Sequence, residues 1–220
     1  MEKISVIGAG TMGSGIAQVA ATFNIQVTVV DDDPNAMDSS QKKLAKILNR
    51  LAEKGKILES DVPNIINHIT WTSDLTQVSD SDVVIEAIIE NTEIKQNLFS
   101  RLQAIVSENC ILATNTSSLS VSEIFSVIKH QHRTLGIHFF NPVPLMKLVE
   151  TIPIEDTDST VLQNVRLMLQ SWGKTVVEAK DTPGFIVNRV ARPFYGEALK
   201  INEDGIADYA TIDWAMKELG

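Results

Sequence analysis

The sequence has little of what disulfide-bonded, membrane-spanning or nucleic-acid-binding proteins need. Its 220 residues contain a single cysteine, Cys110, so no internal disulfide framework exists. No apolar run approaches the ~20 residues that cross a bilayer, and the first predicted strand starts close to Met1, so we expect a cytoplasmic protein with no membrane partner. The formal net charge is −9 without a compensating basic stripe, which argues against nucleic acid as a partner.

Other absences narrow the chemistry. The His, Cys, Asp and Glu residues show no spacing typical of metal ligands, so we predict no metal. Cys110 lies in an apolar run and is predicted to be a buried structural thiol. His68, His130 and His132 lack a partner motif and are expected at the surface. The composition, with 44% hydrophobic and 21% charged residues, is that of a globular enzyme with a sizeable core.

The N-terminal segment has the pattern of a βαβ unit. A short apolar strand runs into a glycine-rich turn and a helix, and a second strand follows that ends at Asp31. The glycines have G-x-G-x-x-G spacing: Gly8, Gly10 and Gly13. They permit a tight turn, close approach of a pyrophosphate to the backbone and close packing of the helix on the strand. Asp31 would accept hydrogen bonds from ribose hydroxyls and repel the extra phosphate of NADP, so NAD is the predicted cofactor.

The rest of the chain continues the alternation of strands and helices. A lysine-rich amphipathic helix at 35–58 and a second helix at 61–67 interrupt this rhythm. Further strands are predicted at 83–86, 111–114, 133–140, 146–152 and 175–178, and further helices at 92–106, 120–128 and 159–172. We therefore predict an α/β fold with a Rossmann-type, doubly wound, mostly parallel sheet and a helical excursion after the second strand.

A histidine and a carboxylate flank a predicted reversal of the chain. His138 lies on one predicted strand and Glu150 on the next, with two prolines between them that prevent a smooth continuation. A carboxylate that accepts one ring N–H of histidine fixes its tautomer, which leaves the other nitrogen free to take a substrate proton. The pattern indicates an acid/base pair, with a purely structural histidine as the alternative.

Five segments, in this order, carry a resemblance over nearly the whole chain. They read GAGTMGSGIAQVAA at 8–21, EAIIENTEIK at 86–95, ATNTSSLS at 113–120, GIHFFNPVPLMKLVE at 136–150 and DTPGFIVNR at 181–189. With them the chain resembles the L-3-hydroxyacyl-CoA dehydrogenases, including the bacterial 3-hydroxybutyryl-CoA dehydrogenases. The resemblance implies NAD-dependent interconversion of (S)-3-hydroxyacyl-CoA and 3-oxoacyl-CoA, with an acyl-CoA thioester such as 3-hydroxybutyryl-CoA as the substrate.

The resemblance also implies roles for individual residues. His138 would be the catalytic base, Glu150 would orient it, and Ser117 and Asn188 would bind the reacting oxygen of the substrate. Lys54 would contact the CoA moiety. The implied cofactor contacts are Gly8, Gly10, Thr11, Met12, Gly13, Asp31, Glu90, Lys95, Ser117 and Asn141.

Several of these residues also have structural alternatives. Ser117 could cap the helix predicted to begin near Ser120, because its neighbours are good capping residues. Asn188 could cap a helix or bridge a domain junction. Glu90 and Lys95 could be solvated surface charges.

We divide the chain into an NAD-binding domain at 1–183 and the beginning of an all-helical C-terminal domain at 184–220. Helices are expected at 185–203 and from 211 onward. Members of the family continue with further helices that finish the acyl pocket and supply most of the dimer contact, so this chain is expected to be short at its C-terminus. A homodimer is the state expected for the family, and apolar surface on 185–203 should be exposed and prone to association.

Two other functions remain open. A related dehydrogenase, such as an L-gulonate dehydrogenase of the lambda-crystallin type, would share the cofactor fold and the His–Glu pair but oxidise a sugar acid. A non-catalytic NAD-binding module would bind NADH without turnover.

Overall fold

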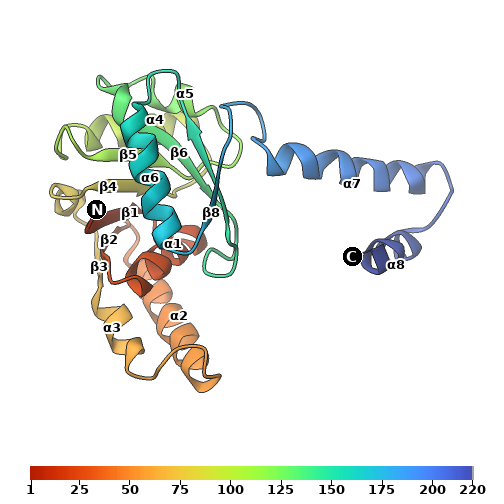
Figure 1. The fold of residues 1–220 in the computed structure, drawn as a ribbon, viewed down its shortest axis with the longest axis horizontal. Coiled ribbons are helices and arrows are strands. Elements are labelled where there is room, and N and C mark those ends of the chain that lie inside the picture. Colours follow the sequence, from red (N-terminus) through yellow and green to blue (C-terminus); the bar gives the residue numbers. More distant parts are fainter. Residues whose placement is uncertain (220) are drawn as a thin grey trace.

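The computed structural model describes residues 1–219, which form a sheet with helices on both faces and two helices that project from it (Figure 1). The strands are β1 (Lys3–Ile7), β2 (Gln26–Val30), β3 (Ile69–Thr72), β4 (Val83–Glu86), β5 (Ile111–Thr114), β6 (Thr134–Phe139), β7 (Leu148–Pro153) and β8 (Thr175–Glu178). Across the sheet their order is β3-β2-β1-β4-β5-β6-β7-β8. Only the β6–β7 pair is antiparallel among the described strands. The predicted Rossmann-type, mostly parallel sheet is confirmed.

The helices cover both faces because alternate side chains of each strand enter different cores. The helices are α1 (Thr11–Thr22), α2 (Pro34–Glu53), α3 (Asp61–Asn67), α4 (Thr92–Leu102), α5 (Val121–Phe125), α6 (Ser159–Ser171), α7 (Val187–Glu203) and α8 (Tyr209–Leu219). On β1, Ile4 and Val6 pack with α1, α2, α3 and α6, whereas Ile7 packs with α4 and α5. The sheet is therefore doubly wound, with the predicted excursion formed by α2 and α3.

Local sequence explains where several helices begin. The side chain of Asp33 accepts a hydrogen bond from the backbone N–H of Asn35, and Pro34 occupies the first helical position of α2, where its missing N–H costs nothing. Asp158 caps α6 in the same way by accepting from the backbone N–H of Thr160. These two aspartates define the starts of helices that cover the same face of the sheet.

Some predicted boundaries were wrong. The edge strand β3 was not predicted, and α5 ends at Phe125 rather than at residue 128. The helix expected from 185 begins at Val187, because Phe185 adopts a left-handed conformation with φ of 46°. Gly220, the last residue of the expected final helix, lies outside the described residues.

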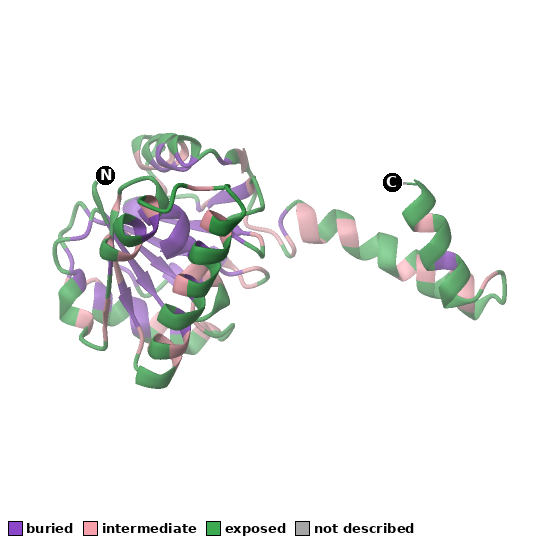
Figure 2. Ribbon diagram, turned by 90° about the horizontal axis from the view of Figure 1, so that it is seen from below, coloured by how far each residue is buried: buried purple, intermediate pink, exposed green. Residues whose placement is uncertain are grey.

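The two C-terminal helices extend away from the sheet (Figures 1 and 2). No residue of α7 is buried, and α8 buries only Ile212 among its described residues. The exposed apolar side chains include Val190, Phe194, Tyr195, Leu199 and Trp214. The apolar surface expected on this segment is therefore present.

The sheet order places a switch point between β1 and β4. From β1 the chain continues to β2 on one side, whereas the strand on the other side of β1 is β4. In open α/β sheets, ligands bind at such a point beyond the carboxyl ends of the strands. Here those ends are Ile7, Val30 and Glu86, which lead directly into Gly8, Asp31 and the loop before α4.

Candidate functional site

The glycine-rich turn has the geometry that a dinucleotide needs. Gly8 has φ of +107°, and a Cβ there would lie 2.7 Å from the carbonyl oxygen of Ala87. A Cβ on Gly13 would lie 1.9 Å from the carbonyl oxygen of Gly8, so only glycine allows α1 to approach β1 this closely. Gly10, the N-cap of α1, has open space around its missing Cβ and no side-chain cap.

The first turn of α1 follows directly. Thr11 is exposed at its first position, and the partly buried Met12 packs against the core. Because the first N–H groups of α1 lack a side-chain acceptor, they are available to an anion such as a pyrophosphate. The residues present therefore fit an NAD phosphate group.

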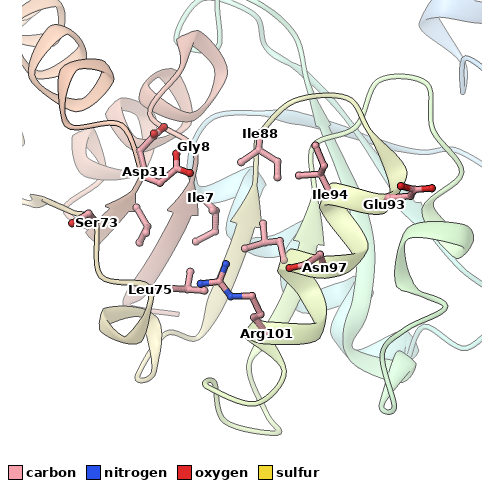
Figure 3. A pocket seen from close by; sticks show the side chains of 13 residues that line it. Ile7, Gly8, Asp31, Ser73, Leu75, Ile88, Glu93, Ile94, Asn97 and Arg101 are labelled. Carbon is pink, nitrogen blue, oxygen red and sulfur yellow. The ribbon is translucent and has the colours of Figure 1, made fainter.

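A cavity of about 470 Å³ lies beside this turn (Figure 3). Gly8 and Asp31 lie on one side of it, and Arg101 projects from α4 toward Ile7 and Leu75 (Figure 3). Asp31 is held by two backbone donors: the N–H of Ala9 donates to its Oδ2 at 2.6 Å, and the N–H of Asp33 donates to its Oδ1 at 2.9 Å. The carboxylate is thus fixed at the edge of a half-apolar cavity of nucleoside size.

His138 and Glu150 are opposite residues on the antiparallel strands β6 and β7. The Nδ1 atom of His138 lies 2.7 Å from Oε2 of Glu150, and the two residues are 5% and 0% exposed. The second carboxylate oxygen, Oε1, accepts hydrogen bonds from the backbone N–H groups of Ile186 and Val187, both at 2.9 Å. The contact inferred from the chain reversal is present, and it leaves Nε2 of His138 as the free ring nitrogen.

Ser117 lies in the loop after β5 and joins two other predicted residues. Its backbone N–H donates to Oε1 of Glu90 at 2.8 Å and its hydroxyl donates to the same oxygen at 3.2 Å. Asn188 donates through Nδ2 to the carbonyl oxygen of Ser117 at 3.1 Å. Ser117 does not cap α5, because Ser120 accepts from the backbone N–H of Glu123 and takes that position. Asn188 does bridge α7 to the sheet domain.

Glu90 collects several donors at its Oε1 atom. Burial raises the pKa of Glu90, but hydrogen bonds from Thr116 and Ser117 and the charge of Lys95 together lower it by more. The net shift of its pKa is downward, so Glu90 is ionised at neutral pH.

Lys95 is not a solvated charge. It is 1% exposed, and its Nζ lies 2.5 Å from Oε1 of Glu86 and 3.4 Å from Oε2 of Glu90. Glu86, at the end of β4, is fully buried and also accepts from the hydroxyl of Thr114 at 2.6 Å. Sequence reasoning missed Glu86, although an acid that ends an otherwise apolar strand could have indicated it.

A second cavity, of about 510 Å³, is lined by α1, α2 and the loop after β6. Asn141 and Gly10 line it, together with Lys43 and several apolar residues of α2, which include Ile47. Lys54 does not line it, because this exposed residue lies beyond the last turn of α2, as its C-cap. Sequence reasoning assigned Lys54 to the CoA moiety but did not assign the residues of α2 that face the cavity.

The loop that carries Asn141 is held by another residue that the sequence did not indicate. The ammonium group of Lys174 donates to the carbonyl oxygens of Val143 and Met146, at 2.5 and 2.8 Å. Burial lowers the pKa of Lys174. This lysine therefore ties the loop to the start of β8.

The remaining expectations concern residues away from the site. Cys110 is buried, and burial raises its pKa to about 12. His132 is exposed, whereas His68 and His130 are partly exposed. Within residues 1–219 there is no group of three or more His, Cys, Asp or Glu side chains that could hold a metal ion. No helix among the described residues is long and apolar enough to span a membrane.

Comparisons with known proteins identify the family. A family model described as "3-hydroxyacyl-CoA dehydrogenase, NAD binding domain" matches residues 3–182, and one described as "3-hydroxyacyl-CoA dehydrogenase, C-terminal domain" matches residues 184–220. A probable 3-hydroxybutyryl-CoA dehydrogenase of Bacillus subtilis is 43% identical over 217 residues, which are 99% of this chain and 76% of that protein.

Solved structures give the same result. The (S)-3-hydroxybutyryl-CoA dehydrogenase of Ralstonia eutropha has a TM-score of 0.95 and 36% identity, over 99% of this chain and 77% of that chain. The 3-hydroxybutyryl-CoA dehydrogenase of Escherichia coli K12 has a TM-score of 0.92 and 39% identity, over 94% of this chain but only 44% of that chain. Because a domain model matches most of its length and a relative is 43% identical across it, the chain belongs to the 3-hydroxyacyl-CoA dehydrogenase family.

Proposed function

We propose that this protein is an NAD-dependent dehydrogenase that interconverts (S)-3-hydroxyacyl-CoA and 3-oxoacyl-CoA, with short acyl chains such as the 3-hydroxybutyryl group. The observation that carries the proposal is the buried contact of 2.7 Å between Nδ1 of His138 and Glu150, in a chain whose glycine turn fits a dinucleotide. The names of its relatives supply the substrate class, an acyl-CoA thioester.

In the oxidative direction, Nε2 of His138 accepts the proton of the substrate 3-hydroxyl group. NAD, when bound, supplies the acceptor for the hydride that leaves C3. Glu150 stabilises the imidazolium that forms, because its Oε2 already accepts the Nδ1–H of His138. In the reductive direction, the protonated His138 donates its proton to the ketone oxygen of the substrate.

Ser117 and Asn188 are assigned to the reacting oxygen of the substrate. Asn188 lies on α7 and Ser117 lies after β5, so the two residues approach from different parts of the chain. The hydroxyl of Ser117 is 3.2 Å from Glu90, a long hydrogen bond that a substrate oxygen can replace. Hydrogen-bond donors placed at this oxygen would favour the polarised carbonyl group.

The cofactor is assigned to the turn and cavity beside β1. The phosphate groups of the cofactor are assigned to Gly8, Gly10, Thr11, Met12 and Gly13. Asp31, fixed by two backbone donors, is assigned to the ribose hydroxyls and favours NAD over NADP. The assigned contacts near the nicotinamide are Glu90, Lys95, Ser117 and Asn141.

The CoA moiety is assigned to the second cavity. It has a largely apolar lining from α2, which suits a pantetheine chain, and Lys43 places a positive charge beside it. Lys54, exposed at the end of α2, is kept as a contact for the phosphates of CoA outside the cavity.

The test follows NADH absorbance during reduction of acetoacetyl-CoA by the 220-residue chain. We expect His138→Gln to lower kcat by ~10²–10⁴-fold, the usual contribution of a positioned acid/base, while the affinity for NADH stays nearly unchanged. His132→Gln is the matched control, because His132 is exposed in the turn before β6, and it should retain the parent kcat.

Separate reactions with NADPH, and with a free sugar acid plus NAD, distinguish the alternatives. Turnover of the sugar acid but not of acetoacetyl-CoA would favour a gulonate-type dehydrogenase. NADH binding without any turnover would favour a non-catalytic module. A His138→Gln variant with near-parent turnover would refute the assigned role of His138.

We further propose a division into domains at 1–183 and 184–220, and self-association of the chain through the second of these. The support is the exposed apolar side chains of α7 and α8, which include Val190 at 71% and Phe194 at 56% exposure. Sedimentation velocity should show association that rises with concentration and weakens in Phe194→Glu. A strictly monomeric sample at high concentration would contradict it.

A further inference from the structure

The carboxylate of Glu150 is held from two sides. Its Oε2 contacts His138, and its Oε1 accepts the backbone N–H groups of Ile186 and Val187. Ile186 is the N-cap of α7 and Val187 its first residue, so these N–H groups have no partner within the helix. The positive end of the helix dipole also lies here, which favours a carboxylate at this position. The buried acid of the pair therefore depends on where α7 begins.

The start of α7 is itself set by the linker after β8. Asp181 in this linker accepts hydrogen bonds from the N-terminus of α5 on the sheet domain. The donors are the hydroxyls of Ser120 (3.0 Å) and Ser122 (2.7 Å) and the backbone N–H groups of Val121 (2.9 Å) and Ser122 (2.9 Å). Burial raises the pKa of Asp181, but these hydrogen bonds lower it by more, so the side chain is ionised at neutral pH.

Between Asp181 and the start of α7 the chain turns sharply. Gly184 has φ of 78° and Phe185 has φ of 46°, a left-handed conformation that a phenylalanine adopts only when its surroundings hold it. The ring of Phe185 is buried, and its centroid lies 5.6 Å from that of His138. The turn is thus fixed by Asp181 at one end and by the contacts of Phe185 and Glu150 at the other.

We propose that residues 181–187 are a positioning device for the His138–Glu150 pair, with Asp181 as its anchoring residue. This inference rests on the proposed function for its catalytic consequence. When the anchor is lost, the linker can shift, and Glu150 loses two donors that nothing else described in the structure replaces. A buried carboxylate deprived of its donors will reorient, and His138 loses its fixed tautomer and ring position.

The first variant is Asp181→Asn. It keeps the shape of the side chain but replaces one acceptor oxygen by an NH₂ group, which cannot accept the hydrogen bonds from the N-terminus of α5. We expect kcat for acetoacetyl-CoA to fall by about 10- to 100-fold, the loss that a displacement of about 1 Å causes in a catalytic group. The dissociation constant for NADH should change much less than kcat, because Gly8 and Asp31 make no hydrogen bond to residues 181–187. Ser122→Ala removes one of the four donors and should give an intermediate loss.

The matched control is Asp158→Asn. Asp158 also accepts a backbone N–H at a helix N-terminus, where its carboxylate caps α6, but it contacts neither member of the pair. Both variants should lose thermal stability, and Asp181→Asn should lose more, because the carboxylate of Asp181 accepts four hydrogen bonds and that of Asp158 accepts one. Only Asp181→Asn should lose turnover per correctly folded molecule, counted by NADH binding sites. Equal losses of turnover in the two variants, or a kcat of Asp181→Asn within twofold of the parent, would overturn the proposal.

A second measurement does not depend on activity. The Nδ1 proton of His138, shared with Glu150, should give a downfield proton NMR signal that disappears in His138→Gln. We expect the signal in the parent and in Asp158→Asn, and its loss or broadening in Asp181→Asn. An unchanged signal in Asp181→Asn would refute the positioning role. If the parent shows the signal but no turnover, the proposed function fails while the NMR comparison still decides the positioning role.

Discussion

Replacing Glu86 by Gln should show how much a fully buried ion pair contributes to the stability of the fold. Glu86 is 0% exposed and Lys95 is 1% exposed, and their closest charged atoms are 2.5 Å apart. The substitution keeps the size of the side chain, so no cavity forms. It leaves the ammonium group of Lys95 in the interior with only Glu90 as an opposite charge, at 3.4 Å.

The magnitude follows from this geometry. Removing one partner of a buried pair costs about 3–5 kcal/mol, because the remaining charge stays without water or a counter-ion. Glu90 compensates in part, but its side chain is 36% exposed, so we expect a loss near the lower limit, about 3 kcal/mol. For a chain of this length, about 2–4 °C of Tm is lost per kcal/mol, which predicts a Tm lower by about 6–12 °C.

Thermal denaturation followed by circular dichroism gives the Tm. The double variant Glu86→Gln/Lys95→Met removes the unpaired charge and should recover at least half of the lost stability. Its NADH binding should be weaker than that of the parent, because Lys95 is assigned to the cofactor. Asp38→Asn, which breaks the exposed pair with Lys42, is the control and should leave the Tm almost unchanged. If Glu86→Gln melts within 2 °C of the parent, the reasoning about the buried charge is wrong.

Four further outcomes can be measured. Gly13→Ala should abolish NADH binding, because its Cβ would lie 1.9 Å from the oxygen of Gly8; fluorescence titration with parent affinity would contradict this. Asp31→Ser should raise the ratio of kcat/KM for NADPH to that for NADH by at least ~10-fold, and an unchanged ratio would remove Asp31 from cofactor selection. Arg101→Ala should weaken NADH binding by ~3- to 10-fold at unchanged kcat, since Arg101 lines the cavity assigned to the cofactor. Native Cys110 should not react with a thiol reagent at pH 8, because its pKa is raised to about 12, and fast reaction before unfolding would show that it is accessible.

The sequence predicts the central strands well for a physical reason. Strands buried on both faces read as short, uninterrupted apolar runs, and 83–86 and 111–114 were predicted with the bounds found for β4 and β5. The edge strand β8 was also predicted with its bounds, 175–178, although none of its residues is buried. The edge strand β3 was missed, although its four residues equal the length of β8 and Ile69 among them is buried. Its sequence, Ile-Thr-Trp-Thr, alternates apolar and polar residues as a half-buried strand does, so the local signal was present but was not used.

Helix ends were less predictable than helix positions. The pattern at 35–58 continues past the end of α2 at Glu53, because apolar residues at helical spacing persist into the turn that follows. At α7 the pattern includes Phe185, whose side chain suits a helix although its backbone is left-handed. The tertiary contacts of Phe185 with His138, which decide this conformation, have no local signal.

In the candidate site, too, some contacts have no local signal in the sequence. His138 and Glu150 were predicted to pair because both are side chains with recognisable chemistry on two strands joined by a reversal. The other half of the environment of Glu150 consists of two backbone N–H groups, and every non-proline residue carries one. No residue type at 186 or 187 could have indicated them. Chemistry supplied by the main chain therefore becomes visible only in three dimensions, and here it determines how the carboxylate that faces the histidine is held.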